Sequence, residues 1–134
     1  MKKILMIAVC CMLLVVCGCD KKEEKIQDKK TEVTCKMINL LDDDSTETSI
    51  INLSCVNDKI ESAKMELLNY YTFSYGIEKT KNELAKLYDT CSLISSSTIQ
   101  CNTTLNIQNT KLCSEYVNYI TKANKYKCEE KKEN

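Results

Sequence analysis

Apolar and polar residues alternate along much of the chain, and this period of two is typical of β-strands with one buried face. Three such runs follow one another over residues 33–41, 48–56 and 60–73. In the second run, for example, Ile51 and Leu53 share one side. Because only short polar segments separate the runs, we expect three strands joined as an antiparallel meander.

The segment from Asp42 to Glu47 separates the first two runs and begins with three adjacent aspartates. Three carboxylates could bind calcium. An EF-hand loop, however, requires alternating ligands, a glycine at its sixth position and a glutamate at its twelfth, and this segment lacks that pattern. We therefore interpret it as a hairpin turn.

The turn Asn57-Asp58-Lys59 decides which side chains of the next two strands share a face. A two-residue loop would place Leu53 opposite a serine, whereas a three-residue loop places it opposite Ala63. A slip of one residue moves every side chain of a strand to the other face. We therefore predict the three-residue loop, which pairs Leu53 with Ala63 and Ile51 with Met65.

Beyond Gly76 the apolar period becomes that of an α-helix. One stripe runs through residues 77–91 and consists of Ile77, Leu84, Leu87, Tyr88 and Cys91. We expect this helix to cover the apolar face of the meander. The serine-rich segment 92–97 is expected to form a loop.

Residues 99–107 show the cleanest alternation in the chain and predict a fourth strand. Its outer face is polar but uncharged, so at a sheet edge it could accept a strand from another molecule. Pairing within the same sheet is the interpretation that we prefer. A final apolar stripe predicts a helix over residues 111–125, with Thr110 as its N-cap.

Together these elements predict an α+β domain over residues 32–128, in the order strand, strand, strand, helix, strand, helix (βββαβα). We expect an antiparallel sheet of about four strands with two helices on one face. Residues 19–31 are mostly charged, so we expect a flexible tether before the domain. Residues 129–134 are expected to form a charged tail.

The N-terminus has the layout of a secretory signal peptide, with Met1-Lys2-Lys3 before an uncharged apolar run over residues 4–16. As a helix this run rises only ~20 Å, which is short of the ~30 Å hydrocarbon core of a bilayer. We therefore predict that residues 1–18 are a signal peptide. An uncleaved N-terminal anchor is the alternative.

The signal ends with Val16-Cys17-Gly18-Cys19, which resembles the lipobox of bacterial lipoproteins. The resemblance implies that a diacylglyceryl group is attached to the thiol of Cys19 and that the signal is cleaved between Gly18 and Cys19. Two acyl chains would hold the protein stably at a membrane, since one chain alone binds only marginally. The domain would then be anchored to the cell membrane and face outside the cytoplasm. Val16 and Gly18 also suit ordinary signal cleavage, so free secretion is the alternative.

Composition excludes several kinds of chemistry. The chain has no His and no Arg, and a single glycine follows the signal peptide. Without His there is no Ser-His-Asp or Cys-His nucleophile, and without further glycines there is no phosphate-binding loop. From Cys19 onward, 17 lysines and 19 acidic residues give a net charge near −2, which does not favour nucleic acid. We expect no enzyme, no cofactor and no metal site.

The ten cysteines divide by position. Three lie in the signal peptide, and Cys19 is the lipidation site. The other six are widely spaced without a Cys-x-x-Cys pair, which weakens a zinc interpretation. Their even number in an exported domain predicts structural disulfides among Cys35, Cys55, Cys91, Cys101, Cys113 and Cys128.

Spacing alone leaves the connectivity of these cysteines open. Cys113 and Cys128 would lie ~22 Å apart along a continuous helix, too far for a disulfide with each other. A bond between Cys35 and Cys55 in neighbouring strands is our first choice, and a bond between Cys91 and Cys101 is equally reachable. Other pairings stay open.

The strand order and the hairpin over residues 51–66, INLSCVNDKIESAKME, are similar to those of small YehR-type lipoproteins. The similarity is one of pattern and transfers no functional residue. From the lipobox, the tether and the six cysteines we expect a non-enzymatic binding or structural protein of the cell envelope, held at the membrane through the lipid on Cys19. A freely secreted, disulfide-stabilised binding or effector protein is the alternative.

Overall fold

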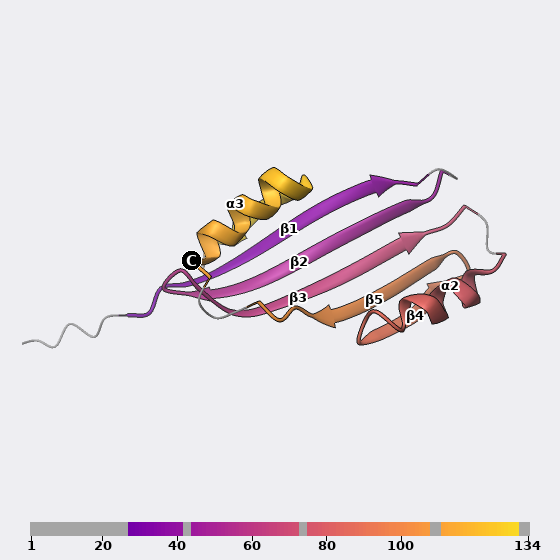
Figure 1. The fold of residues 1–134 in the computed structure, drawn as a ribbon, viewed down its shortest axis with the longest axis horizontal. Coiled ribbons are helices and arrows are strands. Elements are labelled where there is room, and N and C mark those ends of the chain that lie inside the picture. Colours follow the sequence, from indigo (N-terminus) through magenta and orange to yellow (C-terminus); the bar gives the residue numbers. More distant parts are fainter. Residues whose placement is uncertain (1–26, 42–43, 73–74, 108–110, 132–134) are drawn as a thin grey trace, which may run out of the picture.

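The computed structural model describes residues 27–41, 44–72, 75–107 and 111–131. Its strands form one antiparallel sheet in the order β4-β5-β3-β2-β1-β6 (Figure 1). The elements are β1 (Lys30–Leu40), β2 (Thr46–Val56), β3 (Lys59–Tyr70), α2 (Ile77–Leu84), β4 (Thr90–Ser95), β5 (Thr98–Thr104), α3 (Cys113–Asn124) and β6 (Lys127–Lys131).

The predicted four-stranded βββαβα fold is therefore wrong, because the sheet has six strands and the helices are short. Both additional strands lie at the outer edges of the sheet. β4 takes residues that were assigned to the end of the first helix and to the serine-rich loop. α2 ends at Leu84, seven residues before the predicted end at Cys91, and Leu87 of the predicted apolar stripe is 77% exposed.

β6 follows α3 because the helix stops at a left-handed residue. Lys125 has φ 57°, which turns the chain so that Tyr126 and β6 come back alongside β1. Four of the five β6 residues are charged, so the sequence has no alternation of apolar residues that would predict this strand. β6 runs through Lys131 and includes the first three residues of the segment expected to form a tail.

The pairing predicted for the central hairpin is confirmed, since Leu53 lies opposite Ala63 and Ile51 opposite Met65. The loop that produces this register differs from the prediction. Val56 pairs with Lys59, which leaves a two-residue turn at Asn57-Asp58 with left-handed φ angles of 51° and 63°. A bulge next to Ser54 and Cys55 then supplies the extra residue that restores the apolar face.

Both helices pack against the same face of the sheet. Around α3, a first apolar cluster joins Cys113 and Ile120 to residues of β1, β2 and β3, and a second cluster joins Ile77 of α2 to β3 and β5. Among the described elements, none lies over the opposite face, which is mostly polar and carries Thr34, Lys36, Asn52, Lys64, Gln100 and Asn102.

β5 pairs with β3 on one side and with β4 on the other. The preferred interpretation of residues 99–107, pairing inside the sheet, is therefore confirmed for the strand Thr98–Thr104. This strand has no free edge. The free edges among the described strands are those of β4, β6 and the end of β1 beyond β6.

Candidate functional site

All six cysteines of the domain form disulfides, so the prediction of structural disulfides is confirmed. Cys91 bonds to Cys101, as expected. The first choice for Cys35 is wrong, because Cys35 bonds to Cys128 and Cys55 bonds to Cys113. Cys35 lies opposite Ile51, four residues along β2 from Cys55, which is ~13 Å at the rise of a strand and too far for a disulfide.

Two of the three disulfides hold the outermost strands. Cys35 in β1 lies directly opposite Cys128 in β6, with 4.0 Å between their Cα atoms, and Cys91 in β4 lies directly opposite Cys101 in β5, with 4.1 Å. The edge strands have only five and six residues. Each is therefore attached covalently to a longer neighbour.

The third disulfide and one carboxylate hold the start of α3. Cys55 in β2 is bonded to Cys113, the first residue of the helix. The Asp58 carboxylate accepts hydrogen bonds from the backbone N–H (2.9 Å) and the hydroxyl (2.7 Å) of Ser114. These two bonds lower the pKa of Asp58 from its ordinary value. The predicted cap, Thr110, lies outside the described residues, and the observed N-cap residue, Leu112, provides no side-chain hydrogen bond.

A buried polar pair joins β2 to the residue that precedes β6. The hydroxyls of Ser49 and Tyr126 are 2.7 Å apart and both side chains are buried. Burial raises the pKa of two other tyrosines, Tyr88 and Tyr116. These two phenols therefore stay protonated at neutral pH and offer no nucleophile or general base.

The free edge of β1 presents exposed apolar side chains beside unpaired strand backbone. β6 pairs with β1 only from Glu32 to Lys36. The segment Met37–Leu40, which we call the open β1 edge, has no strand beside it on that side among the described residues. Its side chains are uncharged, and Ile38 and Leu40 are 59% and 80% exposed.

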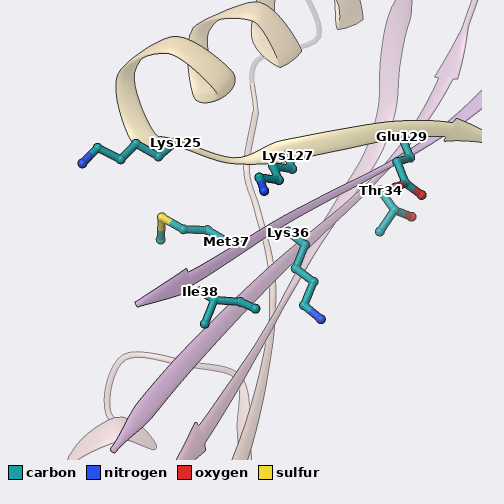
Figure 2. A pocket seen from close by; sticks show the side chains of 7 residues that line it. All are labelled: Thr34, Lys36, Met37, Ile38, Lys125, Lys127 and Glu129. Carbon is teal, nitrogen blue, oxygen red and sulfur yellow. The ribbon is translucent and has the colours of Figure 1, made fainter. Parts of the chain in front are cut away.

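A hollow of about 410 Å³ lies against the open β1 edge, at the point where β6 begins. Figure 2 shows it between β1 and the chain that leaves α3 and enters β6. We call it the lysine hollow; it is lined by Thr34, Lys36, Met37, Ile38, Lys125, Lys127 and Glu129. Three lysines and one glutamate make it a positively charged site.

A larger hollow, about 620 Å³, lies beside the start of α3. Its lining includes Asp58, Ser114 and the cysteines of the Cys55–Cys113 disulfide. The carboxylate and the hydroxyl in it already bind each other to cap the helix. The lysine hollow is therefore the better candidate for an external ligand.

The structure assigns roles to several residues that sequence reasoning singled out, and leaves others untested. The six cysteines are joined, whereas Cys17, Gly18 and Cys19 of the lipobox and Asp42 and Asp43 of the aspartate run lie outside the described residues. In the described ranges, no group of three or more His, Cys, Asp or Glu side chains is placed to hold a metal ion, and no helix there is long and apolar enough to cross a membrane.

Sequence reasoning missed the lysine hollow, because Lys36 comes from one end of the domain and Lys125 and Lys127 come from the other. The sequence predicts only a charged tail over residues 129–134, and the pairing of β6 with β1 is what places residues 127–131 beside Lys36 and its neighbours. Comparison of the chain with protein-family models, with curated proteins and with solved structures finds no match among any of them.

Proposed function

We propose that this chain is a lipid-anchored protein that faces outside the cytoplasm and acts by binding, without catalysis. The lipobox residues Val16 to Cys19 supply the anchor in this proposal, and the disulfide-bonded domain supplies the binding surface. The protein body then needs no apolar membrane face of its own, because the acyl chains hold it at the bilayer.

The observation that carries the proposal is the complete pairing of the six domain cysteines. Disulfides persist in oxidising compartments and are reduced in the cytosol of most cells. A domain whose two edge strands and helix α3 are all held by disulfides is suited to a position outside the cytoplasm. This supports the signal peptide predicted for residues 1–18.

The placement of the open β1 edge agrees with an anchored binding protein. The described chain enters the sheet at Lys30, and β1 runs from there along the whole length of the sheet (Figure 1). Eleven residues of strand span ~35 Å. The open β1 edge is therefore presented at the end of the sheet far from the entry of the chain, where an anchor at Cys19 would leave it accessible.

The anchor is tested by membrane fractionation of the native host that expresses either the wild-type chain or Cys19→Ser. We expect the wild-type protein in the membrane fraction, resistant to extraction with salt and released by detergent. Cys19→Ser should appear in the soluble or secreted fraction. Membrane attachment unchanged by Cys19→Ser would contradict the lipid anchor.

The second candidate is a freely secreted, disulfide-stabilised binding protein. The three disulfides support it equally, because secreted domains use the same oxidising environment. The two candidates differ in the acyl group. Wild-type protein found in culture supernatant without lipid would favour secretion.

A further inference from the structure

We propose that the open β1 edge binds the C-terminal end of an extended peptide segment of a partner protein, which adds as a strand antiparallel to β1 and places its terminal carboxylate in the lysine hollow. The inference rests on the proposed function, since it names the partner chemistry of that binding protein. Strand addition to an exposed sheet edge and capture of a terminal carboxylate are both established modes of peptide recognition.

The backbone of the open β1 edge is oriented for strand addition. In an antiparallel ladder, successive residues direct their N–H and C=O groups to opposite neighbours, and pairs whose backbone groups point away from each other have the shorter Cα separation. Cys35 and Cys128 form such a short pair, at 4.0 Å. The backbone of Cys35 therefore faces β2 and that of Lys36 faces β6. By the same alternation, Ile38 and Leu40 direct their N–H and C=O groups to the free side.

The edge lacks the features that usually prevent strand addition. Natural sheets protect their edges with charged side chains, proline or a covering element. β6 follows this rule, with four charged residues out of five. The open β1 edge reads Met-Ile-Asn-Leu, without charge or proline, and no other strand of the described residues pairs on that side.

The direction of the added strand follows from the position of β6. β6 runs antiparallel to β1 and begins at Lys127, opposite Lys36. An added strand that is antiparallel to β1 would lie in line with β6 and would point its C-terminal end at Lys127. β6 blocks its continuation, so a chain terminus fits there better than the middle of a longer strand.

The charge at this point favours a carboxylate. Lys36 and Lys127 lie directly opposite each other on neighbouring strands, an arrangement of like charges that is unfavourable in the absence of an anion. Lys125 and Glu129 also line the hollow, but Figure 2 shows the Lys125 side chain directed away from Lys36 and Lys127, so the charge at this point comes mainly from these two lysines. None of the three lysines forms an ion pair within the described ranges. A parallel added strand would instead bring an N-terminal ammonium to the lysines.

The test measures fluorescence anisotropy of a labelled six-residue peptide of alternating threonine and valine, with a free C-terminal carboxylate or with a C-terminal amide. Both are titrated with the purified full-length chain in its disulfide-bonded state. We expect the acid to bind with a Kd below about 1 mM and the amide at least tenfold more weakly. The double variant Lys36→Gln, Lys127→Gln should weaken binding of the acid at least fivefold.

Two further variants distinguish the contribution of the lysine charges to peptide binding from that of the β1 backbone. Lys64→Gln removes an exposed lysine from the same sheet face on β3 and should leave the affinity unchanged. Leu40→Pro removes an N–H that points outward and no bond of the sheet, and it should weaken binding at least fivefold while the circular dichroism spectrum is retained. Equal binding of acid and amide, absence of binding, or an equal effect of Lys64→Gln would overturn the proposal.

Analytical ultracentrifugation of the same samples tests whether a second copy of the chain occupies the open β1 edge instead of a partner peptide. We expect a monomer. A dimer that Leu40→Pro dissociates would make a second copy of the chain the occupant and would also overturn the proposal. These measurements do not depend on the acyl group, so their failure is distinct from a failure of the Cys19→Ser fractionation test.

Discussion

Asp58 caps α3 from a turn that lies 56 residues earlier in the chain, through two hydrogen bonds that its carboxylate accepts from Ser114. The turn also contributes a backbone bond, because the N–H of Cys113 donates to the carbonyl oxygen of Asp58 (2.7 Å). A hairpin turn on the sheet therefore provides the acceptors that the free N–H groups of the first helical turn require. The negative charge is also favourable beside the positive end of the helix dipole.

We expect Asp58→Asn to lower the melting temperature at pH 7. Asparagine tolerates the left-handed backbone of this position, φ 63°, so the variant removes the charge without adding backbone strain. Thermal unfolding followed by circular dichroism measures the effect. Glu61→Gln, an exposed carboxylate in the same hairpin, is the matched control and should leave the melting temperature unchanged.

The same cap predicts a dependence on acid pH. The folded-state pKa of Asp58 is lowered by its hydrogen bonds with Ser114 from an ordinary value of 3.8. The stabilisation is therefore fully present above the unfolded-state pKa and is lost as pH falls through the folded-state pKa. The difference in melting temperature between wild type and Asp58→Asn should be constant from pH 5 to 7 and should shrink below pH 4. A difference that grows on acidification would contradict this role.

Removal of the Cys35–Cys128 disulfide should destabilise the domain more than removal of Cys91–Cys101. The two bonds close sequence separations of 93 and 10 residues. The loop-entropy relation assigns them about 5 and about 3 kcal/mol. Urea unfolding of the two double-alanine variants measures the order. An equal loss, or a larger loss for Cys91→Ala, Cys101→Ala, would show that chain entropy does not set their contributions.

The Ser49–Tyr126 pair should behave as a coupled unit. Both hydroxyls are buried and 2.7 Å apart, so Tyr126→Phe or Ser49→Ala leaves one polar group unsatisfied and should cost about 1–3 kcal/mol. The double variant should cost less than the sum of the two single variants. Tyr119→Phe, which alters a tyrosine that is 60% exposed, should change the free energy of unfolding by less than about 0.5 kcal/mol.

The alternation of apolar and polar residues correctly predicts those strands that have a continuous apolar face of their own. The central hairpin has the predicted apolar pairs, because a slip of one residue would expose Leu53 and Ile51. β5 is found where its alternation predicts it. In both cases a continuous apolar face in the sequence corresponds to a buried face in the structure.

The edge strands could not be predicted in the same way. β4 contains three serine or threonine residues out of six, and β6 has one apolar residue, Cys128. Each is joined to a longer strand by a cross-strand disulfide, and β6 meets a partner 93 residues away in sequence at Cys35. The lysine hollow depends on that same long-range pairing, so a local sequence pattern could not predict it either.

The most direct test of the account is the intact mass of the protein isolated from its native host, before and after reduction and alkylation. We predict a chain that begins at Cys19 with a diacylglyceryl adduct and that gains six alkyl groups only after reduction, two for each of the three disulfides. An unlipidated chain, or one whose six cysteines are alkylated without reduction, would contradict a lipid-anchored and disulfide-bonded protein outside the cytoplasm.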